Sequence, residues 1–516
     1  MNKHRQLVVN LFAQILGFIV SMAISFFLTP FIVENVGREA YGFVGLANNF
    51  VEYAQVLVVA LNSMASRFIT ISIFQNKNDD TNKYFSSVVF ANIFISLVLI
   101  LPMIWILMNL SNIVNVPLQI ENDVLLLWLF IFLNFLISII GSSFGVATFA
   151  KNRLDLSSMR MIESNLIKSL ILIISFTFFK PAVWYIGFSS LIFTLYTTLF
   201  NVHYTRTLLP QIELSFKHFE VKKIQELLAS GIWNSFNKMS SIMSSGLDLL
   251  IANLYIGASA MGLLSLSKSL PTIILTLFAR ISGVFSPTLT QSYAENNLED
   301  MKKQLILSMK VLGLFSSIPM AGIFAYGHSF YQLWVPSQDP RMLYWLTVIS
   351  SFAFVFALPM EGLWNIFTIT NRVKQSSIFL FINSMLTILI VFFSVQLVSD
   401  ANIRLFILAG VSTFFSVIRA LTFLPMYGAY CLKLPIITFY PTILKNVVSV
   451  VTITLFSLFL SSILPIQSWF ILLTLASITG VFGLLLNSYI LLSSSEREFF
   501  LIKIRRRLQA RFKGGQ

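Results

Sequence analysis

Apolar blocks of about 20 residues or more recur along the whole 516-residue chain, separated by short polar gaps. A helix of that length crosses the roughly 30 Å hydrocarbon core of a membrane, because each residue adds about 1.5 Å. With 56% hydrophobic and only 11% charged residues, the chain has too little polar surface for a soluble globule. The blocks therefore predict an all-α protein that crosses a membrane many times.

Fourteen spans are predicted, and several are long enough to tilt or to extend beyond the bilayer. They cover residues 10–33, 41–74, 84–108, 122–148, 158–178, 183–206, 226–256, 262–290, 303–328, 341–368, 376–397, 403–429, 438–463 and 468–492.

Lys and Arg are distributed unevenly between the two sides of these spans. The gaps and span ends on the side of the two termini carry 24 of them, and those on the opposite side carry four. Cytoplasmic segments are enriched in Lys and Arg, so both termini are predicted to lie on the cytoplasmic side of a bacterial cell membrane. The net charge of +14 is thus a topology signal and does not indicate nucleic-acid binding.

Cysteine and histidine are too sparse for redox or metal chemistry. The single Cys431 excludes an intramolecular disulfide, and four scattered histidines provide no Cys/His cluster for a metal ion. No metal and no cofactor are therefore predicted.

The chain contains an internal repeat. Shifting the sequence by 220 residues aligns positions 36–83 with 256–303 without a gap and gives 11 identities in 48 positions. Six spans separate the copies, so the two halves have the same orientation and are expected to be related by an axis along the membrane normal.

The repeat predicts two six-helix lobes with further segments around them, an architecture found in transporters. The predicted divisions are an N-terminal lobe at 1–206, a cytoplasmic linker with an amphipathic helix at 207–229, a C-terminal lobe at 230–430, helices 13 and 14 at 431–493, and a basic cytoplasmic tail at 494–516.

Eleven ionisable residues fall inside the predicted spans, seven basic and four acidic. They are Glu52, Arg67, Glu163, Lys168, Lys238, Asp248, Lys268, Arg280, Lys310, Glu361 and Arg419. Facing all of them to lipid would cost on the order of 30 kcal/mol, so most are expected to face inward. Local alternatives exist for some of them: Arg67 and Lys310 can snorkel to the cytoplasmic surface, and Glu163 can pair with Arg160.

Helical spacing places many polar residues on shared faces, as the walls of a watery cavity would require. The cavity residues predicted to contact a polar substrate are Gln14, Asn48, Gln55, Asn62, Asn234, Ser241 and Ser245. The basic surplus favours an anion, for which Arg offers a bidentate fork and Lys a point charge. The predicted anion-binding residues are Lys238, Lys268, Arg280, Arg419, Arg67 and Lys168. The acidic candidates for ion coupling or counter-charge are Glu52, Asp248 and Glu361.

Two segments resemble a known transporter family. The Gly37-x-x-x-Tyr41-Gly42 turn and the segment from Ala60 to Phe68, together with the fourteen spans and the repeat, are similar to the polysaccharide-transporter (Wzx-like) branch of the multidrug/oligosaccharidyl-lipid/polysaccharide (MOP) flippase superfamily.

The resemblance implies a flippase that moves undecaprenyl-(di)phosphate-linked oligosaccharide, a precursor of capsule, O-antigen or teichoic acid, from the inner to the outer leaflet by alternating access. It implies a lipid-linked glycan and membrane lipids as partners, H⁺ or Na⁺ as candidate coupling ions, and glycan polymerase or ligase machinery as neighbours. Under this interpretation Lys238, Lys268 and Arg280 hold the diphosphate. The lipid II flippases of the superfamily carry an Arg-rich first span, which is missing between Asn10 and Val33.

Two other classes remain open. A cation-coupled exporter of small molecules related to MATE transporters would have a similar architecture but would favour an acidic cavity, the opposite of the charge found here. A membrane-embedded glycan polymerase or ligase would need an acceptor-binding loop and an acid or base on the outer face, whereas the longest outer gap runs only from Asn109 to Glu121. The sequence therefore favours a transporter over an enzyme.

Overall fold

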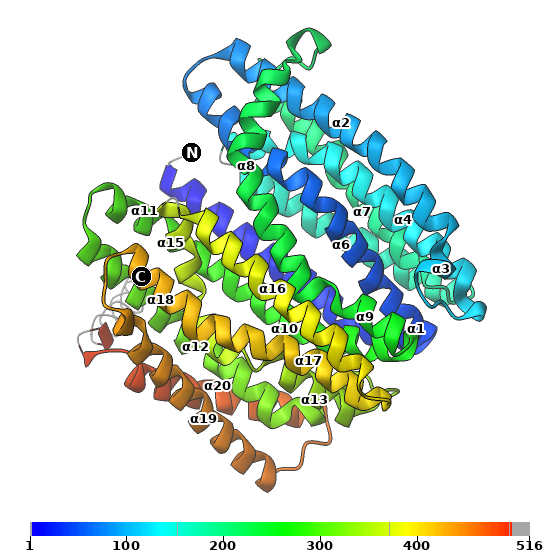
Figure 1. Cartoon of the computed structure of the whole chain (residues 1–516), viewed down its shortest axis with the longest axis vertical. Coiled ribbons are helices and arrows are strands. Elements are labelled where there is room, and N and C mark those ends of the chain that lie inside the picture. Colours follow the sequence, from blue (N-terminus) through cyan, green and yellow to red (C-terminus); the bar gives the residue numbers. More distant parts are fainter. Residues whose placement is uncertain (1–2, 152, 371, 495, 498–516) are drawn as a thin grey trace, which may run out of the picture. The chain divides into compact units, whose positions relative to one another are not determined.

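Nearly every described residue is helical, as expected where lipid leaves no water to satisfy backbone N–H and C=O groups. The computed structural model describes residues 3–151, 153–370, 372–494 and 496–497 (Figure 1). No β-strand occurs within these residues, so the all-α prediction is confirmed. Residues 498–516 of the predicted basic tail lie outside the described part of the chain.

The helices follow the predicted spans, with short irregular turns between them. The first part of the chain forms α1 (Lys3–Phe74), α2 (Asn78–Met108), α3 (Leu110–Ile113), α4 (Glu121–Ser142), α5 (Val146–Ala150), α6 (Leu154–Phe178), α7 (Trp184–Leu208), α8 (Val221–Ser241) and α9 (Asp248–Tyr255). The second part forms α10 (Ala258–Gly283), α11 (Ser286–Ala294), α12 (Leu298–Trp334), α13 (Pro340–Ser351), α14 (Phe354–Ala357), α15 (Trp364–Ile369), α16 (Val373–Gln396), α17 (Ala401–Ile418), α18 (Leu424–Cys431), α19 (Tyr440–Ile463) and α20 (Trp469–Ile490). The 3₁₀ turns are η1 (Leu118–Ile120), η2 (Ser143–Gly145), η3 (Phe216–His218), η5 (Leu358–Leu363) and η7 (Ile436–Phe439), and the π turns are η4 (Ile242–Gly246) and η6 (Arg419–Phe423).

Twelve segments of the described chain are long and apolar enough to cross a membrane, so the predicted count of fourteen is not confirmed. One of the twelve, Phe12–Phe74, covers the second predicted span and all but the first two residues of the first, because only Gly37 (φ 80°, ψ 160°) interrupts the helix between them. The predicted span 226–256 is not among the twelve. It is helical but polar, and the π turn η4 divides it into α8 and α9.

The backbone conformation repeats with the predicted offset of 220 residues. Gly37 and Gly257 both have positive φ, 80° and 132°, and Asn76 and Asn296 both have φ 55°. The N–H of Lys77 donates to the carbonyl of Ser72 at 3.0 Å, and the equivalent bond in the second copy measures 2.9 Å. The left-handed conformation favours Gly and Asn, which explains why these residue types recur at the two turns.

By packing, the chain divides into two compact units. Unit 1 comprises residues 1–266 and 377–408, and unit 2 comprises residues 267–376 and 409–516. The helices α8 and α9 belong to unit 1 by packing, although the sequence repeat assigns them to the second copy. The lobes at 1–206 and 230–430 follow from the repeat and stay a prediction.

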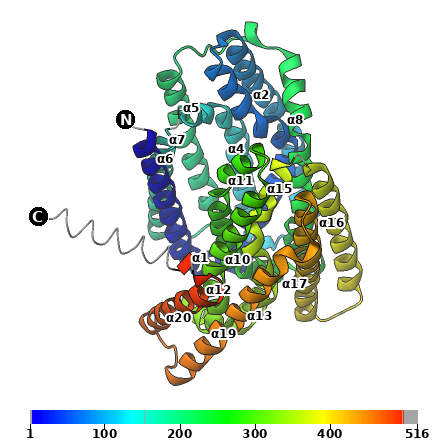
Figure 2. The same ribbon diagram turned by 90° about the vertical axis from the view of Figure 1, so that its left-hand side faces the viewer.

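Gly37 divides α1 into a first arm before it and a second arm after it. In unit 1, the second arm packs against α8, and the first arm packs against α6. In unit 2, α12 packs against α13, α19 and α20, and α19 and α20 lie side by side (Figures 1 and 2). Buried polar contacts hold α19 and α20 in place: Asn446 donates to the carbonyl of Val355 at 2.9 Å, and Asn487 donates to that of Leu314 at 2.8 Å. Each bond satisfies a side-chain amide N–H that would otherwise be costly to bury.

An ion pair fastens the residues after α20 to α12. Lys310 donates to both carboxylate oxygens of Glu496, at 2.9 and 2.8 Å, and the N–H of Ser493 donates to the same carboxylate at 2.7 Å. Burial by itself raises the pKa of Glu496, but the hydrogen bonds from Lys310 and Ser493 outweigh it and hold the pKa below its usual value. Lys310 is therefore paired with an acid, whereas the sequence left snorkelling open for it.

Replacing Glu496 by Gln is expected to lower the free energy of unfolding by about 1 kcal/mol at neutral pH. A carboxylate with a lowered pKa stabilises the fold above its unfolded pKa of about 4.3, and the contribution disappears as the pH falls through the folded value. Thermal unfolding of the wild type and the E496Q variant should therefore differ at pH 7 and converge only when the pH falls below the lowered pKa of Glu496. A difference that stays constant across this range would contradict the role of the ion pair.

Candidate functional site

A polar stripe runs along the second arm of α1 and faces α8 over part of its length. Asn48, Glu52 and Gln55 are exposed on this stripe, and Lys238 of α8 donates to Glu52 Oε2 at 3.1 Å. The side chain of Glu52 is 49% exposed and that of Lys238 is 26% exposed, so the pair is accessible and not buried in the core. Glu52 thus provides a counter-charge beside one of the predicted anion-binding residues.

Close packing of α1 and α8 fixes this pair. A Cβ on Gly231 would lie 1.9 Å from the carbonyl oxygen of Ala60, so only glycine permits the crossing. One turn further, Ser235 donates to the carbonyl of Val56 at 2.6 Å, and Asn234 donates to Ser63 Oγ at 3.0 Å. The predicted cavity residue Asn234 therefore contributes to this helix contact.

The π turn η4 widens the helix between α8 and α9. Its last residue, Gly246, accepts hydrogen bonds from Asn49 Nδ2 and Tyr53 Oη, both at 2.7 Å. Asp248 follows at the start of α9 with 5% exposure and interacts electrostatically with Tyr53. Such turns leave carbonyl groups outside the regular ladder and are frequent at functional sites. Asn49 and Tyr53, which the sequence did not single out, hold this turn against α1.

Two predicted cavity serines flank or fall within this turn. Ser241 is exposed at the end of α8, whereas the side chain of Ser245 lies outside the described part of the structure.

Asn62 is held in a structural network. Its amide exchanges hydrogen bonds of 3.1 and 2.9 Å with Asn92 of α2, and Asn92 also donates to Ser143 Oγ at 2.9 Å. Asn92 is fully buried, so the network satisfies a polar group inside an apolar bundle. Asn62 therefore links α1 to α2, and its predicted contact with a glycan stays a prediction.

Replacing Asn62 by Leu is expected to reduce stability by about 1–3 kcal/mol, because the buried carbonyl oxygen of Asn92 loses the hydrogen bond from Asn62, although the Asn92 amide keeps Ser143. Detergent-solubilised protein should unfold at lower temperature, and the double variant Asn62→Leu with Asn92→Leu should recover part of the loss. Unchanged stability of the single variant would contradict this structural role.

The first arm of α1 and helix α6 carry further predicted residues of unit 1. Gln14 of α1 is partly exposed. Lys168 lies on α6, three residues after Asn165, which donates to Ser21 of α1 at 2.9 Å. Within the described residues, no carboxylate forms an ion pair with Lys168. Arg67 is exposed near the end of α1. Arg160 and Glu163 form the predicted local ion pair, at 2.6 Å.

Unit 2 holds the other predicted charges. Lys268 is partly buried and Arg280 is exposed on α10, while Arg419 begins the π turn η6 and Glu361 lies in η5. Glu361 and Arg419 interact electrostatically. The structure therefore pairs Glu52 with Lys238 in unit 1, whereas Glu361 and Arg419 of unit 2 interact only electrostatically. A joint site of Lys238, Lys268 and Arg280 draws on both units and stays a prediction.

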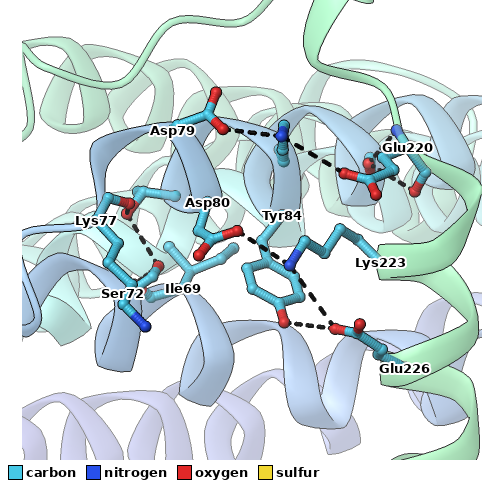
Figure 3. A network of polar contacts seen from close by, with 12 residues as sticks. Ile69, Ser72, Lys77, Asp79, Asp80, Tyr84, Glu220, Lys223 and Glu226 are labelled. Carbon is cyan, nitrogen blue, oxygen red and sulfur yellow. Dashed lines mark hydrogen bonds and ion pairs between the residues drawn. The ribbon is translucent and has the colours of Figure 1, made fainter.

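Figure 3 shows a network of charged residues between the starts of α2 and α8 in unit 1, which the sequence did not predict. Lys223 of α8 forms an ion pair with Asp80 of α2 at 3.0 Å and lies 4.4 Å from the centre of the Tyr84 ring, whose hydroxyl donates to Glu226 at 2.6 Å. Burial lowers the pKa of Lys223, but the hydrogen bond to Asp80 and the nearby carboxylates outweigh it and raise the pKa overall.

A second ion pair extends this network, between Lys83 and Asp79 at 2.8 Å. The i, i+4 spacing of these two residues was visible in the sequence, whereas the contacts to α8 depend on tertiary packing. The network fastens the start of α2 to the start of α8.

Comparisons with known proteins agree with this fold. A sequence model of the family described as "Polysaccharide biosynthesis protein" matches residues 7–293. The chain is 27% identical over 419 residues to the "Uncharacterized membrane protein EpsK" of Bacillus subtilis (strain 168), a match that covers 81% of this chain and 82% of that protein.

Two solved structures are similar at low sequence identity. A multidrug resistance MATE family transporter of the MOP superfamily, in an inward-facing conformation, gives a TM-score of 0.65 at 12% identity and covers 83% of this chain and 99% of its own. The lipid II flippase MurJ, in an inward closed conformation, gives 0.59 at 14% identity and covers 95% and 98%. At these identities the likeness shows the fold alone, and it confirms the predicted MOP flippase-like architecture. Because the family match spans more than half of the sequence, the chain belongs to the polysaccharide biosynthesis protein family, the polysaccharide-transporter branch that its sequence resembles.

Proposed function

We propose that this protein is a flippase that moves undecaprenyl-(di)phosphate-linked oligosaccharide from the inner to the outer leaflet by alternating access. The observation that carries the proposal is the family match over residues 7–293, in a chain with the fold of a lipid II flippase. Capsule, O-antigen and teichoic acid precursors are the candidate cargoes. The protein would act in the bacterial cytoplasmic membrane with both termini in the cytoplasm, beside a glycan polymerase or ligase.

The charges inside the spans suit an anionic headgroup. Lys238, Lys268 and Arg280 would bind the diphosphate, since charge-assisted hydrogen bonds to phosphate are among the strongest that side chains form. The partly exposed pair of Lys238 and Glu52 supports this assignment, because an accessible lysine can exchange its carboxylate partner for phosphate. Moving an anion outward is favoured by roughly 2.3 kcal/mol per charge for each 100 mV of inside-negative potential.

Coupling to H⁺ or Na⁺ would use the acidic residues. Asp248 is the strongest candidate, because it is buried at the start of α9, directly after the irregular turn η4. Glu52 and Glu361 each lie near a basic residue and would adjust the local charge.

A cation-coupled exporter of small molecules is the second candidate. The fold is compatible with it, because a MATE transporter gives a TM-score of 0.65 and MurJ gives 0.59. The seven basic residues against four acidic ones in the predicted spans favour an anionic cargo instead.

The leaflet in which the lipid-linked glycan accumulates distinguishes the two candidates. In cells depleted of the protein, a membrane-impermeant reagent that reacts with sugars should label less of the undecaprenyl-linked glycan, and the unlabelled glycan should accumulate on the cytoplasmic side. Normal labelling from outside would overturn the flippase proposal and shift attention to cation-dependent efflux.

A further inference from the structure

Two arginines occupy corresponding positions in the two halves of the chain. The sequence Asn-Arg occurs at 152–153 and again at 371–372, an offset of 219 residues. The N–H of Arg153 donates to the carbonyl of Thr148 at 2.8 Å, and that of Arg372 donates to the carbonyl of Phe367 at 2.7 Å. The same turn thus ends α5 and α15, and it places an arginine at the same point of each.

The surroundings of the two guanidinium groups differ. Arg153 forms a two-point ion pair with Asp155, with Nε–Oδ1 and Nη2–Oδ2 distances of 3.0 and 3.1 Å. At the position that corresponds to Asp155, the second half has Lys374. Among the described residues no carboxylate forms an ion pair with Arg372, whose guanidinium lies 5.0 Å from the centre of the Tyr430 ring. Arg372 therefore keeps its charge available, and the ring holds the group in place.

Aromatic rings extend from Arg372 along α18 to the end of η6. Phe423, Tyr427 and Tyr430 recur at helical spacing, with centroid distances of 5.1 and 6.0 Å and interplanar angles of 17° and 23°. Phe367 of α15, which contacts α18, supports the middle ring at 5.1 Å (Figure 1). Tyr430 is 64% exposed, so the ladder ends in an accessible ring beside the arginine.

We propose that Arg372 and Tyr430 form a capture site for the phosphate–sugar headgroup of a lipid-linked glycan. The guanidinium would bind phosphate oxygens through its fork, and the exposed part of the Tyr430 ring, beside Arg372 and Tyr427, would contact the apolar face of the first sugar. Positive-inside counting places Arg372 at the cytoplasmic end of its span, where such a substrate is made. The inference rests on the proposed function and names a binding site that lies apart from the charges inside the spans.

Native mass spectrometry of the purified full chain with three lipids tests this site. The lipids are undecaprenyl diphosphate carrying one N-acetylglucosamine, undecaprenyl diphosphate alone, and phosphatidylglycerol. Replacing Arg372 by Gln should weaken binding of both diphosphates by about tenfold or more, because charge-assisted hydrogen bonds to phosphate are lost. Arg372→Lys, which keeps the charge but not the fork, should give an intermediate loss.

The tyrosine variants distinguish the contribution of the sugar to binding from that of the phosphate. Tyr430→Ala should weaken binding of the sugar-bearing lipid more than that of the bare diphosphate, whereas Tyr430→Phe keeps the ring and should bind like the wild type. Arg153→Gln is the matched control, because its guanidinium is already occupied by Asp155, and it should also bind like the wild type.

The possible outcomes separate this inference from the proposed function. Equal diphosphate binding by wild type, R372Q and R372K would overturn the capture site and leave the flippase proposal standing. If R372Q lost as much affinity for phosphatidylglycerol as for the diphosphates, and the sugar-bearing lipid bound no better than the bare diphosphate, the site would be an ordinary anionic-lipid site and the inference would be overturned. A wild type that binds neither diphosphate would contradict the proposed function itself. Thermal unfolding of each variant shows whether a loss of binding reflects misfolding.

Discussion

Replacing Gly231 by alanine is expected to remove most of the folded protein. The added Cβ would lie 1.9 Å from the carbonyl oxygen and 2.8 Å from the carbonyl carbon of Ala60, and the backbone of α1 cannot rotate away as a side chain could. Overpacking typically costs about 1–3 kcal/mol, and a clash with backbone is expected at or above the upper end. Separation of α1 and α8 would also disrupt the pairing of Lys238 with Glu52.

Thermal stability in detergent, followed by size-exclusion chromatography, measures this effect. Gly145→Ala is the control, because a Cβ there meets nothing within 4 Å. Alanine is also the better helix former by about 1 kcal/mol, so the control should be neutral or slightly stabilising. Equal stability of the two variants would show that α1 and α8 do not cross as closely as described.

Replacing Lys238 by Gln is expected to reduce glycan export by about tenfold or more. The substitution removes one positive charge and leaves the Glu52 carboxylate, 3.1 Å away in the wild type, to repel an anionic headgroup. Outer-leaflet exposure of the lipid-linked glycan, normalised to the amount of folded protein, measures the loss.

A charge swap separates substrate binding from a purely structural role of this pair. The double variant Lys238→Glu with Glu52→Lys keeps an ion pair between α1 and α8 but moves the cation to the other helix. If Lys238 binds the headgroup, the swap should remain defective while folding normally. Recovery of wild-type export by the swap would show that the pair only holds the helices together.

The sequence predicted this face of the site but not its contacts. Three-to-four spacing placed Asn48, Glu52 and Gln55 on one side of a helix, and all three are exposed in the structure, while their contact with a substrate stays a prediction. The distance between Glu52 and Lys238 depends on how closely two helices approach, which Gly231 sets from the partner helix. Periodicity within one helix carries no information about that approach.

The irregular turns could not be predicted from the sequence, for a different reason. The π turn η4 has no strong local signal, so Tyr53 and Asn49, which bind its last carbonyl, could not be recognised as its partners. Asn62 fitted the cavity stripe by phase, yet its partner Asn92 sits on a different helix, 30 residues away. The repeat, in contrast, was a strong signal, because Gly37 and Gly257 adopt a backbone conformation that few other residues tolerate.

Flipping by the purified chain in proteoliposomes tests the central claim most directly. The probe is undecaprenyl diphosphate linked to a fluorescent N-acetylglucosamine, which a membrane-impermeant reductant bleaches only in the outer leaflet. Without protein, about half of the fluorescence should survive in a symmetric bilayer, and a flippase should expose the protected half. We expect bleaching well beyond half with the wild type and markedly slower bleaching with the Lys238→Gln variant. Protection of half of the probe with correctly folded wild-type protein, as in protein-free vesicles, would contradict the account.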